Sequence, residues 1–189
     1  MDIFLSVFLV GILAGVATAE PLRMEVELRR LNNSLGILKS GEQCDLTSAC
    51  DMRLTGYLDI DAAMNAWPGS KPEDSWVKIV ERDNENAPVI NKIVSRDDCV
   101  GRTTRANLRI KAVDVDSLTA NDLVDNFECM VPVSGSNIAT SISRAQWSTE
   151  KFCDTKYNPG KITLKFRYRV FLIDPADCGR PPVGATAKV

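Results

Sequence analysis

The feature that most constrains this chain is a strict alternation of apolar and polar residues near its C-terminal end. In the stretch KITLKFRYRVFLI, residues 161–173, every second side chain is apolar: Ile162, Leu164, Phe166, Tyr168 and Val170. Successive side chains of a strand point to opposite faces, so this stretch predicts a long β-strand with one buried face. The opposite face carries Lys165, Arg167 and Arg169, which are either solvated or available to phosphates or a protein partner.

Shorter stretches with β-strand character recur along the chain. They span residues 24–31, 52–60, 75–80, 88–94, 106–115, 129–134 and 138–147. With the last strand they predict about eight strands, and none shows the 3.6-residue period of a helix. The pattern is typical of an all-β, antiparallel sandwich whose sheets each have one wet face. At 189 residues the chain suits one domain, and the Pro- and Gly-rich segment 179–189 predicts a disordered tail.

The N-terminus predicts secretion. Residues 3–16 form an apolar run, and Ala17-Thr18-Ala19 follows with the small-x-small pattern of a cleavage site. We therefore expect residues 1–19 to be a signal peptide and residues 20–178 to form the extracellular domain. A retained anchor is the alternative, although about 17 apolar residues is the short limit for a membrane span. No other stretch is long and apolar enough to cross a membrane.

All six cysteines lie in the predicted mature chain: Cys44, Cys50, Cys99, Cys129, Cys153 and Cys178. An even number in a secreted chain predicts three disulfides, with fifteen pairings open. Cys44 and Cys50 are close enough in sequence to close one loop. A zinc site is the competing interpretation, but the chain has no C-x₂-C pair. Secretion also makes Asn32, in the sequon Asn32-Asn33-Ser34, a candidate glycosylation site.

Composition argues against two classes of function. The formal net charge is −2, which does not favour a nucleic-acid-binding protein. The chain has no histidine, which removes the Ser-His-Asp and Cys-His nucleophile pairs. We therefore expect a binding protein and not an enzyme.

Clustered acids are the strongest functional signal. The segment VDVDSLTAND, residues 113–122, ends a predicted strand with Asp114, Asp116 and Asp122. An EF-hand loop beginning at Asp114 fails at its fifth, sixth and twelfth positions. A turn into a short helix, with Thr119 as N-cap, explains Asp122 but not the other two acids. A second acidic loop carries Asp45 and Asp51, six residues apart and just before another predicted strand.

The spacing of these acids resembles the calcium site of the C2 domain family. In that family one loop supplies two aspartates six residues apart, and a later loop supplies D-x-D with a further aspartate six residues on. The resemblance implies an eight-stranded sandwich in which five carboxylates bind calcium: Asp45, Asp51, Asp114, Asp116 and Asp122. Such a site suits a hard cation that takes six to eight oxygen ligands. It also implies loop tips, here Leu46 and Leu118, that contact lipid or a partner.

A second resemblance is to the C2-like N-terminal module of Delta/Serrate/Jagged-type Notch ligands. It rests on Cys50-Asp51 before a strand, on Trp147, on Tyr168-Arg169-Val170 in the last strand, and on the junction from Asp174 to Cys178. The sequence holds no EGF repeats beyond this junction. The resemblance therefore implies a secreted co-ligand or modulator in Notch-type signalling. The alternative is a calcium-dependent phospholipid-binding protein with no receptor role.

Overall fold

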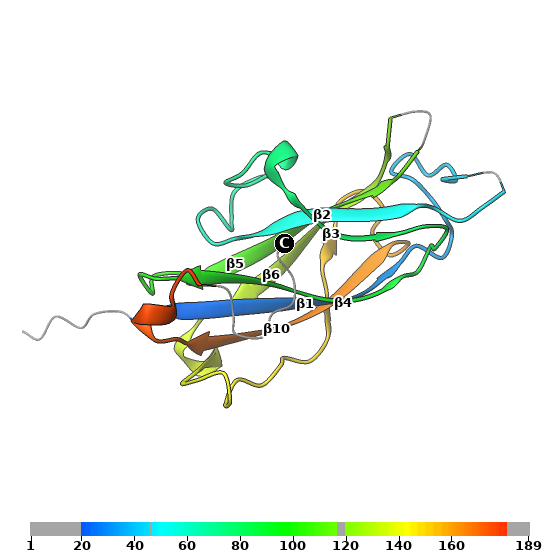
Figure 1. Cartoon of the computed structure of the whole chain (residues 1–189). Coiled ribbons are helices and arrows are strands. Elements are labelled where there is room, and N and C mark those ends of the chain that lie inside the picture. Colours follow the sequence, from blue (N-terminus) through cyan, green and yellow to red (C-terminus); the bar gives the residue numbers. More distant parts are fainter. Residues whose placement is uncertain (1–19, 46, 117–119, 181–189) are drawn as a thin grey trace, which may run out of the picture.

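Two β-sheets pack face to face in the computed structural model, which describes residues 20–45, 47–116 and 120–180 (Figure 1). The first sheet has the order β4 (Val89–Asp98), β1 (Leu22–Asn32), β10 (Thr163–Leu172) and β7 (Ile138–Ala139), and β8 (Lys151–Phe152) also pairs with β10. The second has the order β3 (Val77–Arg82), β2 (Met52–Asp59), β5 (Arg105–Asp114), β6 (Asp122–Pro132) and β9 (Asp154–Thr155). The predicted sandwich is confirmed.

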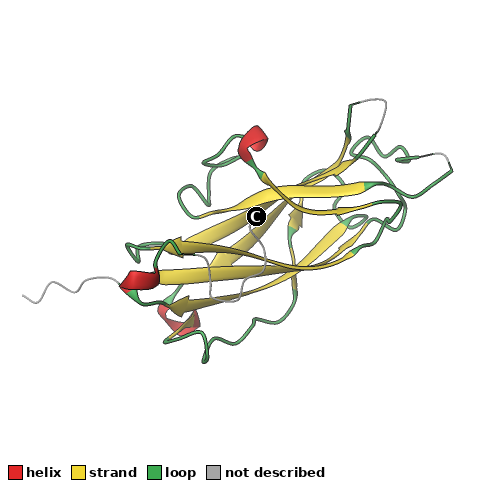
Figure 2. Ribbon diagram, in the orientation of Figure 1, coloured by secondary structure: helices red, strands yellow, loops and turns green. Residues whose placement is uncertain are grey.

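Helical structure in the described residues is limited to three short 3₁₀ turns, at Glu73–Ser75, Gly135–Asn137 and Pro175–Asp177 (Figure 2). The predicted strand over 138–147 is wrong, because only Ile138 and Ala139 pair and the rest forms turns and irregular chain. β7 also runs parallel to β10, so the sandwich is not wholly antiparallel. β6 begins at Asp122, seven residues before the predicted strand that starts at residue 129. The short helix that was the alternative explanation for Asp122 is therefore excluded.

Alternation along β10 places its apolar residues in the core and its cations on the outer face, as predicted. The two arginines are paired across the sheet, because β1 presents acids opposite them, whereas Lys165 lies opposite Arg30 and its Nζ is 3.7 Å from Glu150. Arg167 Nε donates to Glu27 at 2.5 Å and Arg169 Nε donates to Glu25 at 2.7 Å. The Trp147 ring lies 4.9 Å from the Arg167 guanidinium and 4.6 Å from that of Arg169. The two arginines of this row are therefore neutralised and partly covered.

The three disulfides are Cys44–Cys50, Cys99–Cys178 and Cys129–Cys153, which settles the pairing. Cys129–Cys153 ties β6 of one sheet to the chain between β8 and β9, beside β10 of the other. Cys99–Cys178 joins the end of β4 to the chain after β10. Gly179 and Arg180, predicted to start the tail, belong to the domain: Gly179 N–H donates to Asp97, and Arg180 O accepts from Arg23. Residues 181–189 lie outside the described chain.

A fully buried arginine fixes the long connection from β2 to β3 against the outer face of the second sheet. The Arg109 side chain is 0% exposed. Its guanidinium pairs with Asp59 and Glu128 and donates to the carbonyl oxygens of residues 62, 63 and 65. Gly69 packs against the Asp59–Arg109 ion pair, and a side chain at this position would clash because its Cβ would lie 2.3 Å from Asp59 Oδ2. Two of the three tryptophans, Trp67 and Trp76, pack together in this connection with ring centroids 4.9 Å apart.

Replacing Arg109 by Met tests this clamp. The change leaves the Asp59 carboxylate buried without its cation, so we expect a loss of about 3–5 kcal/mol in the free energy of unfolding. Urea unfolding measures the loss. Arg105→Met is the matched control, because Arg105 lies on the same strand but is exposed, and it should cost less than about 0.5 kcal/mol. Equal losses in the two variants would contradict the clamp.

Candidate functional site: an acidic end of the sandwich

Strand pairing brings the two predicted acidic loops together at one end of the second sheet. β5 lies between β2 and β6, and its last residue, Asp114, is opposite both Met52 and Asp122. Asp51 immediately precedes Met52, so Asp51, Asp114 and Asp122 sit at neighbouring strand ends. The register therefore brings Asp51, Asp114 and Asp122 together from segments more than sixty residues apart in sequence. Asp45 and Asp116 lie close enough to Asp114 for their charges to act on its carboxylate.

Backbone hydrogen bonds hold the two central acids in place. The Asp51 N–H donates to Asp114 Oδ1 at 2.6 Å, and the Val115 N–H donates to the Asp51 carbonyl at 2.9 Å. The Asp51 carboxylate in turn accepts the Asn84 N–H at 2.6 Å. These bonds orient the carboxylates without neutralising them, because every donor is an uncharged backbone amide.

Asp114 is the most buried of the five, with 2% of its surface exposed. Burial raises its pKa above the ordinary aspartate value, and the negative charges of Asp45, Asp116 and Asp51 raise it further. The hydrogen bond from the Asp51 N–H opposes this rise in pKa only in part. Three other acids thus act on one buried carboxylate.

The remaining acids differ in exposure. Asp45 is half-buried and accepts the Ser48 hydroxyl at 2.9 Å, and Asp122 is exposed. Asp116 is half-buried, and its Oδ2 is shielded from solvent without a hydrogen-bond partner among the described residues. Within that same part of the chain, none of the five forms a salt bridge with lysine or arginine. The cluster therefore has oxygen atoms to offer and no protein cation to neutralise them.

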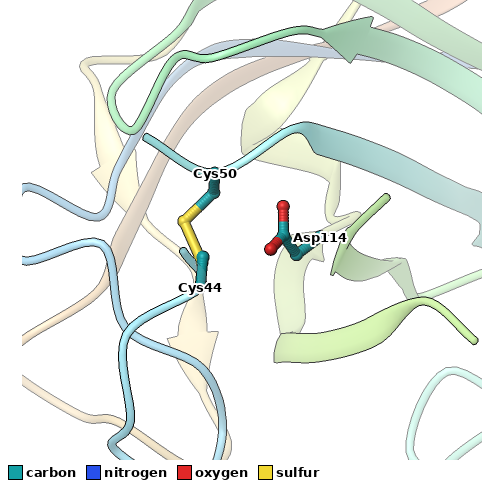
Figure 3. A group of neighbouring side chains, drawn as sticks. All are labelled: Cys44, Cys50 and Asp114. Carbon is teal, nitrogen blue, oxygen red and sulfur yellow. A yellow bond between two sulfur atoms is a disulfide. The ribbon is translucent and has the colours of Figure 1, made fainter. Parts of the chain in front are cut away.

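A disulfide lies against this cluster. Figure 3 shows Cys44 and Cys50 bonded to each other beside the Asp114 carboxylate, and the two sulfurs and a carboxylate oxygen all lie within 4.8 Å of one another. Bonded to each other, the sulfurs are not thiolates and do not bind a metal. The disulfide instead closes the loop that carries Asp45 and places Asp51 directly after its second cysteine.

A third loop, between β3 and β4, was not predicted to belong to the site. Besides holding the Asp51 carboxylate, Asn84 accepts the Ala49 N–H at 2.8 Å, and Asn86 accepts the Cys50 N–H at 2.9 Å. Asn84 has a φ of 52°, a conformation that asparagine tolerates better than most residues. The asparagines in ERDNENA were the available signal, but sequence alone gives no sign of which loop they support.

Other predicted positions have separate outcomes. Asn32 is exposed at the end of β1, as a glycosylation site requires. Leu46 and Leu118, the predicted loop tips, lie outside the described residues. No helix within the described ranges is long and apolar enough to cross a membrane.

Comparison with known proteins supports the fold. No protein-family model and no curated protein matches this sequence. Among solved structures, it is similar to a C2 domain protein from Ramazzottius varieornatus, with a TM-score of 0.77, 27% identity, and coverage of 87% of this chain and 96% of that one. Human GIVD cytosolic phospholipase A2 matches with a TM-score of 0.53 and 15% identity over 83% of this chain, but over only 17% of its own. The chain has a C2-like fold.

The raised pKa of Asp114 gives a pH-dependent prediction for the calcium-free protein. A carboxyl whose pKa is higher folded than unfolded favours the folded state less as pH rises from about 3.9 through the raised value. Asp114→Asn keeps the acceptor oxygen and removes the charge. We therefore expect it to stabilise the protein by about 1 kcal/mol at neutral pH, the order of one close charge pair in water, and to have little effect near pH 3.

Urea unfolding in the presence of a chelator measures this effect. Asp74→Asn, at an exposed acid outside the cluster, is the control and should change stability at neither pH. Destabilisation by Asp114→Asn at neutral pH would show that this carboxylate is not repelled by its neighbours.

Proposed function

We propose that this chain is a secreted, calcium-binding C2-like interaction module, and not an enzyme. The observation that carries the proposal is the convergence of Asp45, Asp51 and Asp116 on the buried carboxylate of Asp114 without a described cation to balance them. A fold that concentrates negative charge in this way is stabilised by anything that binds there and supplies positive charge. The three disulfides are typical of proteins from oxidising, extracellular compartments.

Calcium suits the ligand set better than the other common cations. Carboxylate oxygens are hard ligands, and calcium accepts six to eight of them in flexible geometry. Magnesium needs near-ideal octahedral geometry and keeps several waters, which a site assembled from two loops is less suited to provide. The ligands we assign are Asp45, Asp51, Asp114, Asp116 and Asp122. When bound, the ion would supply positive charge and open coordination positions at the loop end.

The further proposal is that the calcium-loaded end contacts an extracellular partner, as a co-ligand or modulator in Notch-type signalling. Its support is the order of sequence features shared with Notch-ligand N-terminal modules. Two of these have clear structural roles here: Cys50-Asp51 opens β2 at the acidic end, and Trp147 covers the arginines of β10. Phospholipid headgroups are the competing partner, because their phosphates would also complete the coordination of a bound calcium ion.

Calorimetric titration with calcium tests the metal site. We expect the oxidised protein to bind calcium saturably and to melt at a higher temperature in its presence, because the ion binds only the folded state. The double variant Asp114→Asn/Asp116→Asn should lose both effects. Acidification through the raised pKa of Asp114 should also weaken binding, because protons then compete with the ion.

Asp74→Asn is the matched control for this titration and should bind calcium like the parent. Absence of heat and of a melting shift at millimolar calcium would refute the metal site. Binding that persists unchanged in the double variant would place the ion elsewhere.

Sedimentation with vesicles separates the two partner classes. If the partner is a protein, the calcium-loaded protein should stay in the supernatant when vesicles that contain phosphatidylserine are sedimented. Cells that respond to Notch ligands should bind the protein, and a chelator should abolish this binding. Calcium-dependent sedimentation together with no cell binding would overturn the signalling proposal in favour of lipid. Asp114→Asn/Asp116→Asn identifies which of these signals depends on the acidic end.

A further inference from the structure

The Cys44–Cys50 disulfide occupies one wall of the acidic end, and its position has a chemical consequence separate from calcium. Its two sulfurs and an Asp114 oxygen lie within 4.8 Å of one another (Figure 3). The cysteine Cα atoms are 5.3 Å apart. Two thiolates and one carboxylate around a single point are a ligand set for zinc, which takes Cys sulfur at about 2.3 Å and carboxylate oxygen at about 2.0–2.2 Å.

We propose that reductive opening of this disulfide creates a zinc site formed by Cys44, Cys50 and Asp114. A dithiol reductant gives two electrons and two protons to the sulfurs and is itself oxidised to a disulfide. The two thiols lose their protons to solvent when the metal binds. The site does not depend on calcium binding, but it shares Asp114 with the proposed calcium site, so the two ions exclude each other.

Hydrogen bonds made by the backbone hold both cysteines in place without the S–S bond. The Cys44 N–H donates to the Gly36 carbonyl at 2.8 Å. The Cys50 N–H donates to Asn86 Oδ1, and the Cys50 carbonyl accepts the Glu85 N–H at 2.9 Å. Each cysteine is therefore tied to a different segment of the domain. Opening the disulfide lets the sulfurs move apart from their bonded separation of 2.04 Å to the roughly 3.8 Å between two thiolates on tetrahedral zinc, while these hydrogen bonds hold the backbone of both cysteines in place.

The third ligand is held in the same way. Asp114 ends β5, and its Oδ1 accepts the Asp51 N–H, which leaves Oδ2 free of protein hydrogen bonds among the described residues. Next to Cys50, the Asn33 amide donates to its sulfur at 3.7 Å, which favours a negatively charged thiolate. A bound zinc ion would also remove the repulsion that Asp114 experiences from its acidic neighbours.

Exposure allows a reductant to reach this disulfide. Cys50 is 0% exposed but Cys44 is half-buried and offers a point of attack, whereas Cys129 and Cys153 are 0% and 5% exposed. Cys99 is exposed too, but Cys99–Cys178 lies beyond the Leu22 end of β1, while the acidic loops lie beyond the Asn32 end. Reduction of Cys99–Cys178 would therefore not contribute to the site.

Cobalt(II) titration of the full chain tests the proposal, because cobalt replaces zinc and its thiolate complexes absorb light. After dithiol treatment and removal of the dithiol, we expect one cobalt per chain with a thiolate charge-transfer band that zinc abolishes. The oxidised protein should show no such band. Asp114→Asn should weaken cobalt binding by about tenfold or more, while Asp74→Asn should not change it.

Two cysteine variants identify the ligands. Cys44→Ser/Cys50→Ser should give no band after the same treatment, and Cys99→Ser/Cys178→Ser should keep it. A band that survives in the first variant, or no band in the reduced parent, overturns the proposal.

The single variant Cys50→Ser keeps the test decisive if reduction unfolds the protein. It leaves Cys44 as a free thiol beside Asp114 with no reductant present. A cobalt–thiolate band that Asp114→Asn weakens supports the site, and a band that Asp114→Asn leaves unchanged overturns it. Calcium calorimetry on the oxidised parent is a separate readout, so failure of the calcium proposal and failure of this one are distinguishable.

Discussion

The register of β5 between β2 and β6 is the constraint on which the acidic end depends. Backbone pairing places Asp114 opposite Met52 on one side and Asp122 on the other. A slip of one residue in either pairing would turn Leu108, Ile110 and Ala112 out of the core, so burial of those side chains enforces the alignment. The same hydrophobic burial that stabilises the sandwich therefore also forces like charges together. The acidic cluster is therefore a consequence of the strand register that the hydrophobic core imposes.

Carboxylates elsewhere in the fold show how the chain treats an acid with a structural role. Asp98 accepts four backbone N–H groups, from residues 100 to 103, and Asp59 pairs with Arg109. Burial alone would raise the pKa of Asp59, but hydrogen bonds from residues 57, 62 and 70 outweigh it and lower the pKa to about 2. Asp114 is equally buried, yet its pKa is raised. Asp98 and Asp59 each accept several hydrogen bonds, whereas Asp114 accepts one, from the Asp51 N–H, among the described residues.

Much of the fold could be predicted from sequence because strand alternation is a local property. The long strand from 161 to 173 and the two acidic loops carry their signals in consecutive residues. The strand prediction over 138–147 was wrong because the apolar residues of this segment do not alternate into the core. Ile142 is exposed, and Trp147 packs on the arginines of the outer face of β10.

Features that depend on distant residues were not predictable from sequence. The pairing of the two arginines of β10 required the acids of β1, about 140 residues earlier. The buried position of Arg109 required a loop whose carbonyl groups converge on it. Within the site, the acids were identified by spacing, whereas the supporting asparagines of the β3–β4 loop were not, because a polar turn has the same composition whether or not it holds a neighbour.

The Cys99–Cys178 disulfide determines how the domain would respond to mechanical tension. Glu20 and Arg180, the two limits of the described domain, lie at the same end of the sandwich, and the acidic loops lie at the other (Figure 1). Tension applied at the C-terminal side passes through this covalent bond into the end of β4, and β10 is not peeled from its sheet. The acidic end is thus remote from the point at which such a force enters the domain.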